Sequence, residues 1–144
     1  MNLPSKIVIG SDHAGFEYKE AIKQYLAKNN IETIDVGTHS TESCDYPDYA
    51  HAAAREIESG SVEVGILICG SANGVAITAN KHQKIRAALC WQNEIASLAR
   101  LHNDANIICL PARFVTIDEA EEMVHTFITT DFEGGRHQKR VEKI

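Results

Sequence analysis

Short apolar runs alternate with amphipathic segments along nearly the whole chain. The apolar runs fall at residues 6–11, 31–36, 64–69, 86–90 and 106–110, and helix-forming segments fall at 14–29, 48–59, 73–81, 93–101 and 116–129. This alternation is typical of a parallel sheet with helices on both faces. The sequence therefore predicts a single α/β domain over residues 1–144. We expect a Rossmann-like, three-layer α/β/α arrangement with a five-stranded parallel sheet, and a short basic helix after Gly134-Gly135.

Length, charge and the first residues narrow the classes of function. A chain of 144 residues can bury a substantial core, and 44% hydrophobic with 24% charged residues is ordinary for a globular protein. A net charge of −6 argues against a nucleic-acid binder, which needs broad phosphate neutralisation. No apolar run approaches the length of a bilayer span, and the N-terminus lacks the apolar core of a signal peptide. We expect a cytoplasmic protein with neither a nucleic-acid nor a membrane partner.

The cysteines and most histidines predict no metal or disulfide chemistry. Cys44, Cys69, Cys90 and Cys109 are widely spaced, which fits neither a zinc knuckle nor a disulfide framework. Cys90 and Cys109 end β-like runs and are predicted to be buried small hydrophobic residues. Four single histidines lie in polar contexts and are expected to be solvated: His39, His51, His82 and His125.

The segment 64–77 carries the strongest sign of chemistry. An apolar run ends at Cys69, the small-residue turn Gly-Ser-Ala-Asn-Gly follows, and a helix-forming segment comes next. Backbone N–H groups in such a turn and the positive end of a helix attract anions, and the same field favours a thiolate. A merely buried thiol is the alternative interpretation. Cysteine-phosphatase chemistry is disfavoured because Val75 stands where its Cys-x5-Arg pattern needs an arginine.

Polar residues follow three of the predicted strands. They are found at 11–13 (Ser-Asp-His), at 69–71 (Cys-Gly-Ser) and at Arg113. Ligands of open parallel sheets bind at the carboxyl ends of strands, so we expect these residues at one edge. Asp12 could instead only cap a helix. The segment 45–49 (Asp-Tyr-Pro-Asp-Tyr) could be a simple loop and cap, or its aromatic rings could wall a sugar site.

Two further groups do not follow a predicted strand. His102 ends a predicted helix, where a histidine is often only a favourable partner of the helix dipole. Arg136 and Arg140 are four residues apart and therefore share one helix face. They are either solvated or form a clamp for a phosphate monoester.

Taken in order, these segments closely resemble type B ribose-5-phosphate isomerases, within the family that includes galactose-6-phosphate isomerase subunits. The resemblance covers nearly the whole chain. It rests on Gly-Ser-Asp-His-Ala-Gly at 10–15, Asp-Tyr-Pro-Asp-Tyr at 45–49, Cys-Gly-Ser-Ala-Asn-Gly at 69–74, Ala-Asn-Lys at 79–81, His-Asn-Asp at 102–104, and Gly-Gly-Arg-His-Gln-Lys-Arg at 134–140. Each motif alone is weak, but the ordered set is specific.

The resemblance implies reversible interconversion of ribose 5-phosphate and ribulose 5-phosphate through an enediolate, with no metal or cofactor. Cys69 matches the base that moves a proton between C2 and C1, and Ser71 the hydroxyl that moves protons between O1 and O2. His102 matches the residue that opens the furanose ring, and Asp12 lies near the ring oxygen and O1. Backbone N–H groups of residues 70–74 would hold the enediolate oxygen.

The resemblance also implies a substrate-binding set and a partner. Phosphate contacts match His13, Arg113, Arg136 and Arg140, and a sugar contact matches Asn103. Tyr46, Gly70, Asn73 and Gly74 complete the expected binding residues. In this family the site is shared across a homodimer, so the segment 134–144 would pack at a shared site; the sequence does not separate a dimer from a tetramer.

Alternatives and one departure stay open. The same reaction could act on a six-carbon phosphate such as allose 6-phosphate or galactose 6-phosphate. A non-catalytic phosphate-binding module is the rival from another class, and a thiol redox protein is disfavoured because no resolving cysteine lies near Cys69. Ala72 stands where many relatives have glycine, and its methyl group could narrow the loop if the backbone there needs a positive φ.

Overall fold

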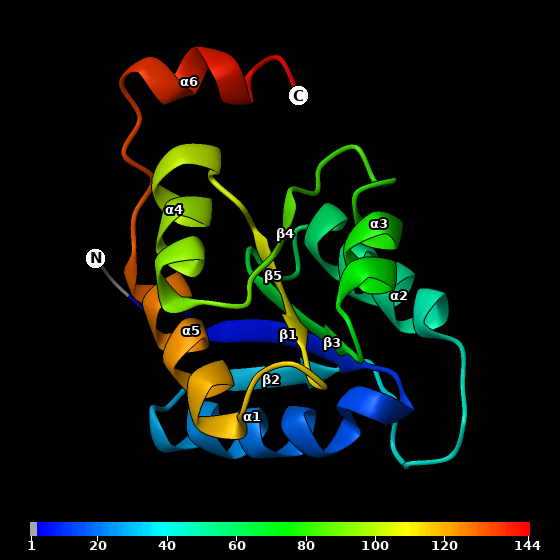
Figure 1. The fold of residues 1–144 in the computed structure, drawn as a ribbon. Helices are drawn as coiled ribbons and strands as arrows, with labels where there is room; N and C mark the ends of the chain where they lie inside the picture. Colours follow the sequence, from blue (N-terminus) through cyan, green and yellow to red (C-terminus); the bar gives the residue numbers. More distant parts are fainter. Residues whose placement is uncertain (1–2) are drawn as a thin grey trace.

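In the computed structural model, which describes residues 3–144, five strands form one parallel sheet in the order β2-β1-β3-β5-β4 (Figure 1). The strands are β1 (Lys6–Ser11), β2 (Glu32–Asp35), β3 (Gly65–Cys69), β4 (Ala87–Leu89) and β5 (Ile107–Pro111). Every neighbouring pair is parallel. The five-stranded parallel sheet expected from the sequence is confirmed.

Helices cover both faces of the sheet, which gives the three layers (Figure 1). One face carries α1 (Phe16–Lys28), α4 (Asn93–Asn103) and α5 (Ile117–Thr129). The other carries α2 (Tyr46–Glu58) and α3 (Asn73–Ala79). A single 3₁₀ turn, η1 (His13–Gly15), precedes α1, and α6 (Arg136–Val141) lies beyond the end of α4.

Successive side chains of a strand point to opposite faces of the sheet, and this alternation divides the hydrophobic core into two parts. In β3, Ile66 and Ile68 pack toward α1, α4 and α5, whereas Leu67 and Cys69 pack toward α2 and α3. Both sets are almost completely buried. A central parallel strand covered on both faces reads as a continuous apolar run, which is why 64–69 looks uniformly hydrophobic in the sequence.

Several element boundaries differ from the expected ones. Helix α2 begins at Tyr46, two residues before the predicted start, because Pro47 lies in its first turn, where proline is well suited to a helix. The predicted helix 14–29 is divided into η1 and α1, since the Asp12 side chain accepts hydrogen bonds from Ala14 N and Gly15 N. Helix α3 ends at Ala79 rather than at 81.

A buried ion-pair cluster fixes the end of β2 against α1. Lys19 Nζ, with no solvent exposure, lies 2.6 Å from Asp35 Oδ2 and 2.8 Å from Glu20 Oε2. Lys23 Nζ also contacts Asp35, at 2.8 Å, and the Gly37 N–H donates to Asp35 Oδ1 at 2.9 Å. Burial raises the pKa of Asp35, but the hydrogen bonds from Lys19, Lys23 and Gly37 outweigh it and hold this pKa below its usual value.

Within residues 3–144, no helix combines the length and apolar character that crossing a membrane would require.

Candidate active site

A cavity of about 470 Å³ opens at the carboxyl edge of the sheet. Its walls come from the ends of β1, β3 and β5 and from the starts of α2 and α3. Seven of its lining residues were singled out in the sequence: Asp12, Tyr46, Cys69, Gly70, Ser71, Gly74 and Arg113. The eighth, Phe114, was not. The polar residues after three strands therefore share one edge, as the topology requires.

Asp12 both caps a helix and faces this cavity. Its Oδ1 accepts from Ala14 N at 3.0 Å and from Gly15 N at 3.1 Å, and the side chain is almost buried. Gly15 is required here because a Cβ would lie 2.7 Å from the Ile68 carbonyl oxygen. The two interpretations weighed from the sequence are thus compatible, since one carboxylate oxygen caps η1 and the side chain still lines the cavity.

Cys69 is the last residue of β3 and is only 5% exposed, yet it lines the cavity. Its carbonyl accepts from Ala112 N at 2.9 Å, which ties the ends of β3 and β5 together. The other two buried thiols lie within the fold: burial raises the pKa of Cys90 to about 12 and raises the pKa of Cys109 well above its usual value. Those two thiols therefore stay protonated and act as buried hydrophobic side chains.

The turn after Cys69 is tightly shaped. Ala72 has φ 66° and is fully buried, so the left-handed backbone considered from the sequence is present with alanine in it. Ser71 Oγ accepts from Asn73 N at 3.3 Å. At Gly70 a Cβ would lie 3.2 Å from Arg113 Nη1, which places the Arg113 guanidinium directly over the glycine.

Aromatic side chains form the outer wall. The Tyr46 ring lies so close to Gly74 that a Cβ at that glycine would overlap it. Phe114, 73% exposed, lines the cavity next to Arg113 and was missed in the sequence. Its position directly after Arg113, a residue already expected at this edge of the sheet, could have indicated that Phe114 lines the site. Asn73, though predicted as a binding residue, lines a neighbouring surface hollow rather than this cavity.

His13 lies in η1, beside the cavity edge. The Cys44 N–H donates to His13 Nδ1 at 3.3 Å. A backbone N–H can only donate, so Nδ1 is unprotonated in this arrangement and a neutral His13 carries its proton on Nε2. That leaves an N–H donor suited to an anion.

The remaining predicted residues lie elsewhere in the chain. His102 and Asn103 are the last residues of α4, and the chain then turns to start β5 at Ile107, at the amino edge of the sheet. Arg136 and Arg140 lie on α6, beyond that end of α4 (Figure 1). Cys69 lies beside Pro111 at the opposite, carboxyl end of β5. Within one chain, therefore, Cys69 does not meet any of these four residues: His102, Asn103, Arg136 and Arg140.

This second group includes two residues that the sequence analysis missed. The His102 ring stacks on His137, with centroids 4.1 Å apart, and His102 Nε2 lies 3.7 Å from Glu133 Oε2. Burial and the nearby His102 lower the pKa of His137, although Glu133 acts in the opposite direction. The histidines at 51 and 82 are not singly solvated either, because His51 Nδ1 lies 2.7 Å from His82 Nε2.

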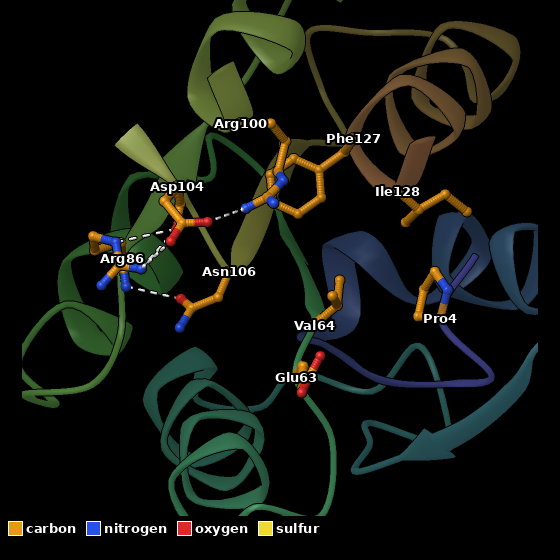
Figure 2. Close-up of a pocket in the computed structure, with 9 residues that line it drawn as sticks. All are labelled: Pro4, Glu63, Val64, Arg86, Arg100, Asp104, Asn106, Phe127 and Ile128. Carbon is orange, nitrogen blue, oxygen red and sulfur yellow. Dashed lines mark hydrogen bonds and ion pairs between the residues drawn. The ribbon is translucent and has the colours of Figure 1, made fainter. Parts of the chain in front are cut away.

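A second cavity, of about 320 Å³, lies at the amino edge of the sheet (Figure 2). Arg86 Nη2 and Arg100 Nη1 lie 3.2 and 2.9 Å from the Asp104 carboxylate. Arg86 Nε also donates to the Asn103 carbonyl at 3.0 Å. Because both guanidinium groups are already paired, this network holds the left-handed turn at Asp104 that follows His102 and leaves little charge for a ligand.

The chain is similar to known isomerases over nearly its whole length. Residues 7–144 match the family model described as Ribose/Galactose Isomerase. Ribose-5-phosphate isomerase B of Escherichia coli (strain K12) is 44% identical over 139 residues, which cover 96% of this chain and 93% of the relative.

Solved structures of ribose-5-phosphate isomerases are also similar to this chain in fold. A ribose 5-phosphate isomerase from Thermotoga maritima has a TM-score of 0.95 and 50% identity, with 96% of each chain covered. Ribose-5-phosphate isomerase B from Mycoplasma genitalium, solved with bound ribulose-5-phosphate, has a TM-score of 0.93 and 41% identity, covering 96% of this chain and 92% of that one. The resemblance drawn from the motifs is confirmed, and the chain belongs to the ribose/galactose isomerase family of enzymes.

Proposed function

We propose that the protein interconverts ribose 5-phosphate and ribulose 5-phosphate through an enediolate, without a metal or cofactor. The observation that carries this proposal is the cavity at the carboxyl edge, where Cys69, Asp12 and Arg113 line one space. The names of the relatives, and the ribulose-5-phosphate bound to one of them, support a five-carbon sugar phosphate as substrate. A cavity of about 470 Å³ accommodates a sugar of this size.

Proton transfer is assigned to Cys69 and Ser71. The Cys69 thiolate takes the proton from C2 of the open-chain aldose, and the electrons move toward O1. The resulting enediolate is held by backbone N–H groups of the 70–74 turn, which act as an oxyanion hole. Ser71 moves a proton between O1 and O2, and the Cys69 thiol returns its proton to C1, which completes the ketose.

Substrate binding is assigned to the side chains around this chemistry. Arg113 and the His13 Nε2–H bind the phosphate, and Asp12 lies near the ring oxygen and O1. Tyr46 and the glycines at 70 and 74 line the cavity and are assigned contacts to the sugar. Asn73 belongs to the loop that holds the enediolate.

Ring opening requires a second subunit in this proposal. His102 opens the furanose, Asn103 contacts the sugar, and Arg136 with Arg140 completes the phosphate site. Because these four lie at the opposite edge from Cys69 within one chain, we propose that they act on the cavity of a partner copy in a homodimer.

The first test is ribulose formation from ribose 5-phosphate by the purified protein in excess chelator. Turnover is expected, and it should be abolished in Cys69→Ala while sugar-phosphate binding persists. Cys109→Ala, which removes a thiol buried in the same layer, should retain turnover. No turnover with ribose 5-phosphate but turnover with allose 6-phosphate or galactose 6-phosphate would reassign the substrate. Binding without any turnover would favour the phosphate-binding module.

The shared site is tested by mixing two impaired variants. Cys69→Ala and His102→Asn chains, unfolded and refolded together, should form mixed dimers in which one of the two sites has both residues. Random pairing then restores about a quarter of the wild-type turnover of cyclic substrate. A mixture no more active than its separate components would contradict the shared site.

A further inference from the structure

Three side chains with metal-binding chemistry meet at the end of α4. His102 comes from the last turn of α4, Glu133 from the segment before α6, and His137 from α6. Their ligand atoms all lie within 4.8 Å of one another. In the sequence the histidines appeared scattered, so only the tertiary structure reveals this cluster.

The backbone that carries the three residues is anchored. Glu133 N donates to the Leu101 carbonyl at 3.1 Å, which joins the segment before α6 to α4 beside His102. Arg100 Nε donates to the Thr130 carbonyl at 3.0 Å and strengthens the same junction. His137 is 5% exposed and is held against α4 by its stack on His102. The backbone thus holds the three residues near one another, and only their side chains must move to bind an ion.

We propose that His102, Glu133 and His137 bind one Zn²⁺ ion, with water as the fourth ligand, and that the ion inhibits the enzyme. Two imidazoles and one carboxylate with an open fourth position are a common zinc set. The inhibition rests on the proposed function, because an ion on His102 removes the side chain that opens the furanose ring. The binding itself does not depend on that role.

Zinc binding requires a modest movement of exposed groups. Ligand atoms about 2.0–2.2 Å from a tetrahedral zinc lie roughly 3.3–3.5 Å apart. The present ligand atoms lie within 4.8 Å of one another, so their spacing must close by up to about 1.5 Å. The lone pair of an imidazole nitrogen lies in its ring plane, and the two planes are now nearly parallel, at 12°. His102, whose side chain is 37% exposed, is free to tilt toward His137, and Glu133, 55% exposed, can follow it.

Charge makes Glu133 the decisive ligand. Arg136 and Arg140 lie on the same helix as His137, and their positive charges act on that ring. They oppose a divalent cation, whereas the Glu133 carboxylate is the negative charge within the cluster. Removing this carboxylate should therefore weaken zinc binding at least as much as removing the His137 imidazole.

The direct test is competition between the protein and a chromogenic zinc indicator at neutral pH. The wild-type chain is expected to take up one Zn²⁺ at this site. His137→Gln and Glu133→Gln should each lower the affinity at least tenfold, because even groups that only support a metal ligand are worth about 10–100-fold. The matched control is His51→Gln, which disrupts the other close histidine pair and should leave zinc binding at the cluster unchanged.

Activity gives the second readout. Zn²⁺ should inhibit turnover of ribose 5-phosphate by the wild type and by His51→Gln, and at least tenfold more zinc should be needed to inhibit His137→Gln or Glu133→Gln. Inhibition that is equal in all four proteins, or zinc uptake lost only in Cys69→Ala, would place the ion on the thiol and overturn the proposal. A chain that binds zinc as expected but isomerises no sugar would refute the proposed function instead.

Discussion

Replacing Ala72 with glycine should leave the stability nearly unchanged, although the residue is completely buried. At φ 66° an alanine is strained by about 1–2 kcal/mol, and glycine relieves this strain. Glycine also loses more freedom on folding, by about 0.4–1 kcal/mol, and the buried methyl group is worth about 0.8 kcal/mol. The opposing effects leave the free energy of unfolding within about 1 kcal/mol of its wild-type value.

Ala76 is the matched control. It lies one turn further on, inside α3, is also buried and has a helical backbone. Ala76→Gly removes the same methyl group and adds the helix penalty of glycine, so it should cost about 2 kcal/mol. The two substitutions are chemically identical, and their difference isolates the backbone conformation of the loop.

The assay is urea unfolding followed by circular dichroism, with all proteins at one chain concentration because association would change the apparent stability. The midpoint for Ala72→Gly should stay near that of the wild type, and the midpoint for Ala76→Gly should fall. If Ala72→Gly lost as much stability as Ala76→Gly, the left-handed conformation at residue 72 would be refuted. Turnover should survive Ala72→Gly, since glycine adopts the same turn.

Three further predictions concern the site edge and its support. Gly74→Ala should lower kcat/KM severalfold or more with a smaller effect on folding, because its Cβ would displace the exposed Tyr46 ring. Steady-state kinetics measure the effect on activity and a melting curve the effect on folding. Unchanged kinetics would contradict the assignment of Tyr46 to the cavity wall. Ser11→Ala should preserve or raise the unfolding free energy, because Ser11 Oγ is buried without a hydrogen-bond partner within residues 3–144; a loss above about 1 kcal/mol would show that the hydroxyl has one. The Asp35 pKa is depressed in the folded state, so its contribution to stability is present above the unfolded value of about 4 and is lost as pH falls through the folded value. Urea midpoints measured from pH 6 to 3 should fall at acid pH, and less steeply in Asp35→Asn; parallel profiles would count against this carboxylate.

The proposed dimer gives a reason for the division of the site residues. The cavity edge supplies a thiol, a hydroxyl and a carboxylate for proton transfer, whereas the α4–α6 group supplies an imidazole and two guanidinium groups. In the proposed function the α4–α6 group opens the ring and the cavity edge transfers the proton, so neither set alone completes the reaction. A monomer would therefore retain the fold while lacking ring-opening activity, and this makes the mixing experiment more informative than a measurement of size.

The sequence alone determined the order of strands and helices, the parallel sheet and the gathering of Asp12, Cys69 and Arg113, although not every element boundary. These follow from local patterns: the apolar period specifies each element, and the carboxyl ends of parallel strands share an edge. The positive φ at Ala72 was raised only as a condition, from the glycine that many relatives have at this position, and the structure shows that the condition holds.

The tertiary structure alone decided how distant segments meet. It placed β5 between β3 and β4, buried Lys19 against Asp35, and brought Glu133 and His137 to His102. A polar side chain in the sequence carries no local sign of its eventual partner, since ion pairs, ring stacks and ligand clusters form between residues far apart in the chain. Packing of α1 on the sheet and of α6 on α4 creates those contacts, and the period of the individual segments does not encode them.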